Sequence, residues 1–310
     1  MITFDKLKLV ADTVTIQEFN ENLFEKVVKD GRTTYKFYQD APYLLVIKID
    51  YSEHEVVIEF TGKILGNEYP KLISSTTIRQ CFQNINSSGV ITLDIDAMMD
   101  ADVVKCDVTK DILFDDIPRL TTYVRTHTSN YNKYVCRKLR NHNIVVEKNV
   151  VTDDIKKRMT IYDKGKEMQK KENQRFVEAY GLDGAFDGVC RFEINLNTKE
   201  QIRNSLGIGN TKLKSVLASE AYPILNFLDE GVDATSTSDT ISDRKSYFTM
   251  LVLQDCDYDL EKVEAKMRTL YPSRGNNIKA IMQPYRQMME RLNKSENTSF
   301  WEEIRQHLSK

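Results

Sequence analysis

A tyrosine followed by two lysines is the first feature of this chain that could do chemistry. Residues 158–167 read RMTIYDKGKE, and apolar and polar residues alternate there as they do in a β-strand. Tyr162 falls on the polar side, and Lys164 and Lys166 follow it. A tyrosine phenolate can attack a phosphodiester and become covalently attached to the phosphate, and a nearby ammonium group would lower its pKa. A half-exposed aromatic residue without a catalytic role is the alternative.

Three further segments alternate in the same way and carry a carboxylate on the polar side. They are EVVIEFTG with Glu59, DVVKCDVTKD with Asp107, and GVCRFEINL with Glu193. Side by side in one antiparallel sheet, they would gather these carboxylates near Tyr162, among Lys105, Lys164, Lys166 and Arg191. A divalent cation between the carboxylates would relieve their repulsion, and oxygen ligands favour Mg²⁺ or Mn²⁺. Cross-strand ion pairs are the alternative explanation.

Asp107 has rivals among the acidic residues of the same region. Asp94, Asp96 and Asp111 are alternatives because LDIDAMMDAD is as acidic as KCDVTKD. We prefer Asp107 because Lys105 shares its face of the strand.

The charge of the chain is unevenly distributed. Residues 119–175 contain fifteen Lys and Arg against six Asp and Glu, a balance of +9. Because the net charge of the chain is −2, the other residues together carry −11. Tyrosines are interleaved with basic residues between 117 and 142. This distribution indicates a surface that faces a polyanion, and a solvated pair of basic helices is the alternative.

The elements around these residues predict an α+β fold in which helices cover one face of an antiparallel sheet. The first 115 residues are mostly strand-like, with a hairpin at 43–51 and 55–62, and helical spacing at 70–89. Residues 117–142 look helical in places, and a second hairpin turns at Asp153 and Asp154. After about residue 199 the segments are helical, with a polar linker at 233–243. We therefore expect a catalytic domain at 1–199 and a helical region at 200–310.

Bulk properties exclude several classes of protein. No apolar run approaches the roughly 20 residues that cross a bilayer, and the first residues do not resemble a secretory signal. The five cysteines are scattered and no two have metal-binding spacing. These features predict a cytoplasmic protein that is not bound to a membrane.

Four motifs in order, EFTGKILG, VVKCDVTKDI, MTIYDKGKEMQ and CRFEINL, resemble replication initiators of the filamentous-phage gene II/X type. The resemblance covers roughly residues 40–200. It implies a Rep-type nicking domain that cuts one strand of a double-stranded origin and becomes joined to the 5′ phosphate through a tyrosine, with Mg²⁺ required. The tyrosine falls on Tyr162 and the metal ligands on Glu59, Asp107 and Glu193. The two histidines of initiators with an HUH motif have no counterpart here.

The resemblance implies a site-specific DNA nicking-joining endonuclease that initiates rolling-circle replication of a phage or plasmid. Lys164 would assist Tyr162, and the DNA-binding residues would be Lys105, Lys166, Arg191, Arg137, Lys138 and Arg140. Supercoiled origin DNA and a host helicase and polymerase would be its partners. A non-catalytic origin-binding protein and a metal-dependent nuclease using water are the alternatives. Tyr123 or Tyr131 could take part in termination, and the C-terminal helices could bind DNA or mediate oligomerisation.

Overall fold

The computed structural model describes residues 1–129, 133–139, 143–149, 157–233, 244–272, 277–292 and 296–309. Arg140, Tyr131, the expected turn at Asp153 and Asp154, and all but the first residue of the expected linker lie outside these ranges. No helix in the described ranges is long and apolar enough to cross a membrane.

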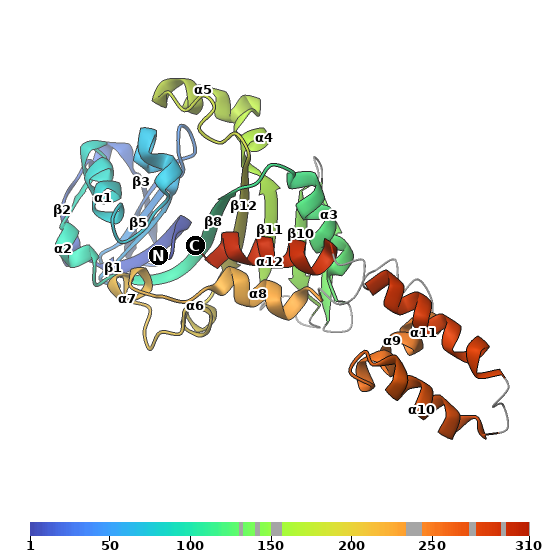
Figure 1. Cartoon of the computed structure of the whole chain (residues 1–310). Coiled ribbons are helices and arrows are strands. Elements are labelled where there is room, and N and C mark those ends of the chain that lie inside the picture. Colours follow the sequence, from blue (N-terminus) through green and yellow to red (C-terminus); the bar gives the residue numbers. More distant parts are fainter. Residues whose placement is uncertain are drawn as a thin grey trace.

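A large antiparallel sheet forms the centre of the molecule (Figure 1). In the described residues its strand order is β3-β4-β5-β6-β1-β8-β12-β11-β10-β9. The strands are β1 (Phe4–Asp12), β3 (Glu25–Lys29), β4 (Arg32–Gln39), β5 (Leu45–Asp50), β6 (Glu55–Thr61), β8 (Asp102–Leu113), β9 (Tyr134–Lys138), β10 (Ile144–Lys148), β11 (Arg158–Asp163) and β12 (Val189–Leu196). A small second sheet pairs β2 (Ile16–Phe19) with β7 (Ile91–Leu93). The expected antiparallel sheet is confirmed.

Helices connect and cover the strands. The α-helices are α1 (Ile78–Ser87), α2 (Ile95–Met98), α3 (Ile117–His127), α4 (Lys164–Met168), α5 (Lys171–Tyr180), α6 (Lys199–Leu206), α7 (Leu213–Leu217), α8 (Pro223–Gly231), α9 (Arg244–Asp255), α10 (Leu260–Leu270), α11 (Ile278–Leu292) and α12 (Glu296–Ser309). The 3₁₀ helices are η1 (Thr13–Thr15), η2 (Glu21–Leu23) and η3 (Gly62–Lys71).

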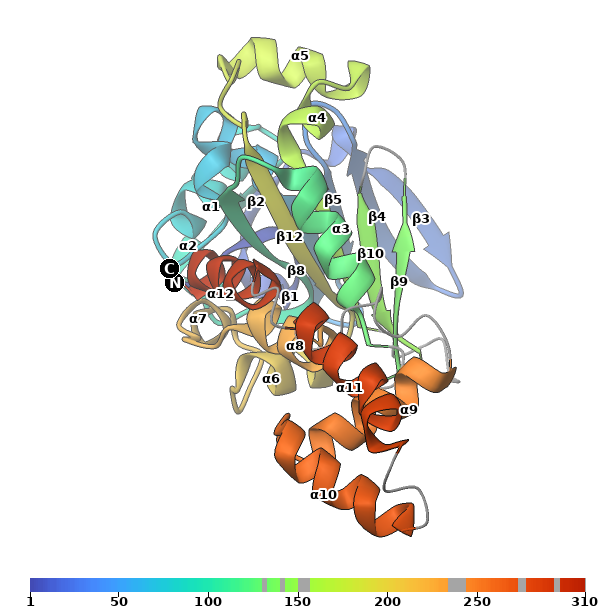
Figure 2. The same ribbon diagram turned by 45° about the vertical axis from the view of Figure 1, so that its right-hand side comes forward.

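One face of the sheet is apolar over its central strands and is covered by helices. Leu9 pairs with Ile58 on one side of the sheet centre, and Val108 pairs with Ile194 on the other. Phe82 of α1 packs on Phe60 of β6, with ring centroids 6.1 Å apart. Helices α3, α8 and α12 cover the other half of the same face (Figures 1 and 2). The opposite face carries the polar residues of the strands, as the alternation predicts.

The segment between 117 and 142 is only partly helical. Helix α3 ends at His127, and residues 134–138 form β9, which pairs with β10. The sequence YVCRK alternates and begins with strand-favouring residues, so pairing at the sheet edge decides its structure. The expectation that 117–142 are helical in places is confirmed by α3, and residues 134–138 are the non-helical part.

The boundary expected at 199/200 does not coincide with a break in the core. Helices α6, α7, α8 and α12 bury their apolar residues in the same core as the sheet, including Trp301 and Ile304. The separate unit is α9–α11, whose core contains Leu253, Met267 and Met282. It projects from the end of the sheet opposite α4 and α5 (Figures 1 and 2). Met282 and Met288 of α11 are buried in this second core.

Candidate active site

Three neighbouring strands place Tyr162 in a row of polar residues. Tyr162 on β11 lies opposite Arg191 on β12, and Arg191 lies opposite Asp111 on β8. Glu193 lies two residues from Arg191 on β12, opposite Thr160 of β11 and Thr109 of β8. The polar face therefore brings the tyrosine, an arginine and two carboxylates together.

Tyr162 and Glu193 form a hydrogen-bonded acid–base pair. The phenolic Oη donates to Glu193 Oε1 at 2.7 Å, and Tyr162 is only 9% exposed. Burial, and then the neighbouring Glu193, raise the pKa of Tyr162 well above its usual value. Burial, and then the charge of Asp5, raise the pKa of Glu193 to about 7. Glu193 can therefore accept a proton from the phenol near neutral pH.

Arg191 is the centre of the site rather than a surface contact. It is 0% exposed, and its Nε and Nη2 donate to the two oxygens of Asp111 at 2.6 and 2.7 Å. Its Nη1 donates to Asp5 Oδ1 and to Tyr69 Oη, each at 2.9 Å. The guanidinium is thus fully surrounded by protein and does not reach the surface, where the predicted contact with DNA would be made. Its charge instead holds the carboxylates of Asp5 and Asp111 in place near Tyr162.

Asp5 is held ionised by this arrangement. Burial alone would raise the pKa of the Asp5 carboxyl, but Arg191 and then Lys164 outweigh burial, so the pKa is lowered. The negative charge of Asp5 in turn contributes to the high pKa of Glu193. Asp5 and Glu193 both lie near Arg191, but Glu193 has the higher affinity for a proton.

The segment after Tyr162 is a helix start and not a continuation of the strand. Asp163 caps α4 by accepting from the backbone N–H of Lys166 at 2.9 Å. Gly165 lies in the first turn, where a Cβ would come within 2.8 Å of the carbonyl oxygen of Phe186. The turn places Lys164 beside the tyrosine and leaves Lys166 on the surface, paired with Asp163 at 2.9 Å.

Lys164 is buried beside Tyr162, but it does not bond to the phenol. Its Nζ donates to Glu167 Oε2 at 2.7 Å and lies 5.7 Å from the centroid of the Tyr162 ring. The residue is 2% exposed. The expected lowering of the phenol pKa by a lysine is therefore not observed, because burial and Glu193 dominate the surroundings of Tyr162.

A second chain of hydrogen bonds joins Lys164 to the covering elements η3 and α5. Asn173 of α5 donates to Glu167 Oε1 at 2.7 Å and accepts from Lys63 Nζ of η3 at 2.6 Å. Burial lowers the pKa of Lys63. The negative charge of Glu167 opposes this effect, and the like charge of Lys164 adds to it. Two ammonium groups thus lie at the covered end of the site.

The three expected metal ligands do not meet. Glu59 lies on β6, three strands from Glu193 on β12, a separation of about 14 Å at about 4.8 Å per strand. Glu59 pairs with Lys6 and with Lys8 at 3.4 Å on the neighbouring strand. Among the described residues no group of three His, Cys, Asp or Glu side chains could hold a metal ion. The expected set of Glu59, Asp107 and Glu193 therefore does not fit one ion.

Asp107 lies on β8, which is between β6 with Glu59 and β12 with Glu193 in the strand order. It accepts from Asn195 Nδ2 at 2.8 Å, and burial raises its pKa against the effect of this bond. Of its rivals, Asp111 binds Arg191 in the row of Tyr162. Asp94 caps α2 and Asp96 pairs with Arg79 at 2.6 Å, so neither belongs to a strand of the sheet. Asp111, and not the preferred Asp107, is the β8 carboxylate nearest the tyrosine along the strands.

The remaining predicted residues are spread over the molecule. Lys105 is on the polar face of β8, opposite Lys8. Arg137 on β9 pairs with Glu147 at 2.7 Å, and Lys138 beside it is exposed. Tyr123 stacks on His127 of its own helix, with ring centroids 4.0 Å apart, under the helix-covered face. It is therefore on the other side of the sheet from Tyr162.

Asp5, Tyr69 and Lys63 belong to the site and were missed in the sequence. Asp5 lies where the pairing of β1 with β8 shifts register between Phe4 and Lys6, so simple alternation does not assign its face. Tyr69 and Lys63 lie on η3, which has no periodic pattern of its own. The motif EFTGKILG contained the only available signal, a lysine directly after a strand.

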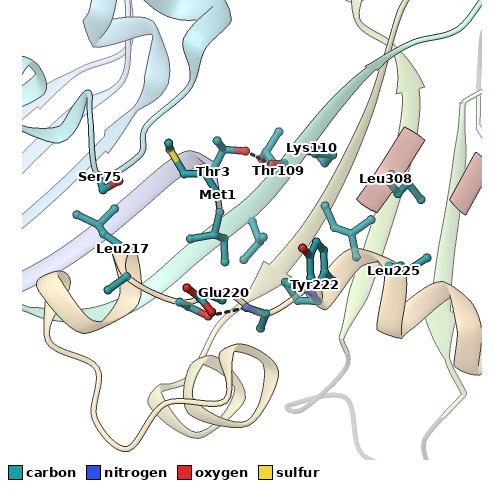
Figure 3. A pocket seen from close by; sticks show the side chains of 17 residues that line it. Met1, Thr3, Ser75, Thr109, Lys110, Leu217, Glu220, Tyr222, Leu225 and Leu308 are labelled. Carbon is teal, nitrogen blue, oxygen red and sulfur yellow. Dashed lines mark hydrogen bonds between the residues drawn. The ribbon is translucent and has the colours of Figure 1, made fainter. Parts of the chain in front are cut away.

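A cavity of about 500 Å³ lies elsewhere, between the first residues of the chain, the start of α8 and the end of α12 (Figure 3). Met1, Leu225 and Leu308 are among its lining residues, and the predicted site residues are not.

Comparisons with protein family models, curated proteins and solved structures found no match for the chain.

Proposed function

We propose that the chain is a DNA nicking-joining endonuclease that acts through Tyr162 and initiates rolling-circle replication. The observation that carries the proposal is the 2.7 Å hydrogen bond from Tyr162 to Glu193, whose pKa of about 7 suits a general base. A nucleophile and an oriented base within hydrogen-bond distance are the usual arrangement in covalent catalysis.

The proposed step exchanges one phosphodiester for another. Tyr162 Oη attacks the phosphorus as Glu193 takes the phenolic proton. The Oη–P bond forms, the bond from phosphorus to the 3′ oxygen breaks, and that oxygen leaves as a hydroxyl after taking a proton from water. The hydroxide left from the water takes the proton held by Glu193, which restores both. The reverse attack by a 3′ hydroxyl rejoins the strand.

The positive charges of Arg191, Lys164 and Lys63 support this chemistry. Arg191 forms ion pairs with Asp5 and Asp111, so neither carboxylate faces an approaching phosphate without a positive partner. Lys164 and Lys63 place ammonium groups at the covered end, where they can stabilise the charge of the phosphate in the transition state.

Dependence on Mg²⁺ or Mn²⁺ stays a prediction. Because Glu59 lies three strands from Glu193, the side chains as placed do not bring the expected ligand set to one ion. No step of the proposal is therefore assigned to a metal.

The proposal is tested by trapping the covalent adduct. Wild-type protein is incubated with supercoiled DNA from its own genetic element, with Mn²⁺ or with EDTA, then denatured and digested. We expect nucleotides attached to the wild type and none attached to Tyr162→Phe. Tyr271→Phe is the matched control, since Tyr271 is exposed at the end of α10.

Each other outcome contradicts a part of the proposal. Nicking by Tyr162→Phe would move the nucleophile elsewhere, and cutting without any adduct would assign the attack to water. Binding without any cutting would indicate an origin-binding protein. An adduct that forms in EDTA would remove the metal from the reaction.

A further inference from the structure

A groove of about 610 Å³ runs over the polar face of the sheet, on strands β4, β5, β6 and β1. It lies on the face that carries Tyr162, opposite the helices, because Glu59 of the groove shares that face with Asp107 through the β1 pairings. The candidate active site does not include this groove. Its residues therefore need their own explanation.

Lysines lie directly opposite one another in this region. Lys36 of β4 faces Lys48 of β5, and Lys8 of β1 faces Lys105 of β8. Like charges in directly opposed positions on neighbouring strands destabilise a sheet. One lysine of each pair has a carboxylate partner, since Lys8 lies 3.4 Å from Glu59 and Lys48 lies 3.8 Å from Asp50. An anionic ligand would supply charge to the other lysine of each pair, Lys36 and Lys105.

The acidic residues of the groove do not remove this excess. Glu59 is shared between Lys6 and Lys8, and Glu25 lies opposite Lys36 on the edge strand. Three lysines and these two glutamates line the groove, and Lys6 and Lys105 border it. With Asp50 beside Lys48 and Asp107 opposite Lys6, the band contains five lysines and four carboxylates, an excess of one lysine.

Apolar side chains lie between the lysines on this otherwise polar face. Val57 faces Lys48 on one side and Val10 on the other, and Val46 faces Tyr38. Tyr38 is 69% exposed. Lysines beside exposed aromatic and aliphatic surface suit a ligand with phosphates and flat apolar groups, which is the chemistry of unpaired nucleotides.

We propose that the groove binds single-stranded DNA next to the phosphodiester that Tyr162 attacks. The inference rests on the proposed function. The band from β4 to β8 crosses four strand spacings, about 19 Å, and β11 lies two strands further. The lysines contact phosphates, and bases lie against Tyr38 and the valines. An unpaired strand is favoured over a duplex because the paired bases of a duplex would not expose their faces to Tyr38.

The test measures binding without cutting. In the Tyr162→Phe background, fluorescence anisotropy follows a labelled 20-nucleotide poly-dT strand and a 20-base-pair duplex over a range of salt. The groove variant is Lys36→Gln with Lys48→Gln, and its matched control is Lys262→Gln with Lys266→Gln on α10. A third variant is Tyr38→Ala.

We expect the groove variant to bind the single strand about tenfold more weakly, with a salt slope lower by about 1.4, from about 0.7 per lost phosphate contact. Tyr38→Ala should also lose about tenfold, as expected for one stacked base. The control should bind like its parent. Because these lysines repel each other, the groove variant should unfold at a temperature no lower than its parent, which separates lost binding from lost folding.

Equal single-strand affinity in the groove variant and the control would overturn the inference. So would a loss confined to the duplex, or no binding of the strand by any variant. An absent covalent adduct with intact, lysine-dependent binding would instead overturn only the proposed reaction.

Discussion

At the scale of single residues, the three carboxylates of the site differ in how closely they approach Arg191. Arg191 binds Asp5 and Asp111 directly and approaches Glu193 only to 4.0 Å. The pKa of Asp5 is therefore lowered, whereas burial raises that of Glu193 to about 7. One carboxylate is left with the proton affinity of a base that works near neutral pH.

Replacing Glu193 by Gln should remove this base while keeping the shape of the side chain. We expect the rate of adduct formation in the wild type to rise with pH through about 7, because only ionised Glu193 accepts the phenolic proton. Glu193→Gln should be slower by about 100-fold or more, with no inflection near 7. A rapid-quench pH profile of both proteins measures this. An unchanged inflection in the variant would assign it to another group.

The same substitution should change how stability depends on pH. The pKa of Glu193 is raised in the fold, so its favourable contribution is fully present below the ordinary pKa and is lost as pH rises through about 7. Gln imitates the protonated form at every pH. The melting temperature of Glu193→Gln, relative to that of the wild type, should therefore be higher at pH 8 than at pH 5.

At the scale of elements, the change from β11 to α4 positions the side chains of the candidate site. Asp163 ends the strand and caps the helix, and Gly165 allows the backbone of Phe186 to approach. The motif YDKGKE thus encodes a sharp strand-to-helix junction rather than an extended basic strand. This explains why Lys164 is buried and Lys166 is exposed.

Gly165→Ala should destabilise the protein, although alanine normally favours a helix. The new Cβ would lie 2.8 Å from a backbone oxygen, and such overpacking costs about 1–3 kcal/mol. Gly209→Ala is the matched control, because nothing lies within 4 Å of its Cβ position. Urea denaturation of both variants measures the difference. Equal stability of the two would show that the junction relaxes freely.

Alternation in the sequence predicts which side of a strand a residue occupies, and this was sufficient for Tyr162, Glu193 and Asp107. It does not predict which strands are neighbours. Insertion of β1 between β6 and β8 moves Glu59 away from the tyrosine, and the irregular pairing of β1 brings in Asp5. Long-range strand order depends on packing of the whole core, which no local pattern contains.

At the scale of the whole molecule, the core continues past residue 199 and returns at the end of the chain. Helix α8 and helix α12 pack against the sheet, whereas α9–α11 form a core of their own between them in sequence. The chain thus inserts a small helical unit into its main domain.

Excising this unit should leave the sheet folded. Residues 234–295 are replaced by a Gly/Ser linker of about 20 residues, which spans about 25 Å on average. We expect a cooperative thermal transition, followed by circular dichroism, close to that of the full chain. Truncation of residues 296–309 is the control and should unfold the domain, because Phe300, Trp301 and Ile304 leave the core. Equal damage by both deletions would contradict the division.

The position of β1 also determines the order in which the protein can be assembled during translation. Residues 4–12 pair with β6 within about 50 residues, but with β8 only after residue 113 has been made. Strand β12 closes the second half of the sheet some 80 residues later still. Such distant pairings give a high contact order and slow folding. The first strand synthesised is therefore half-paired on the growing chain, with an open edge that its later neighbour must find.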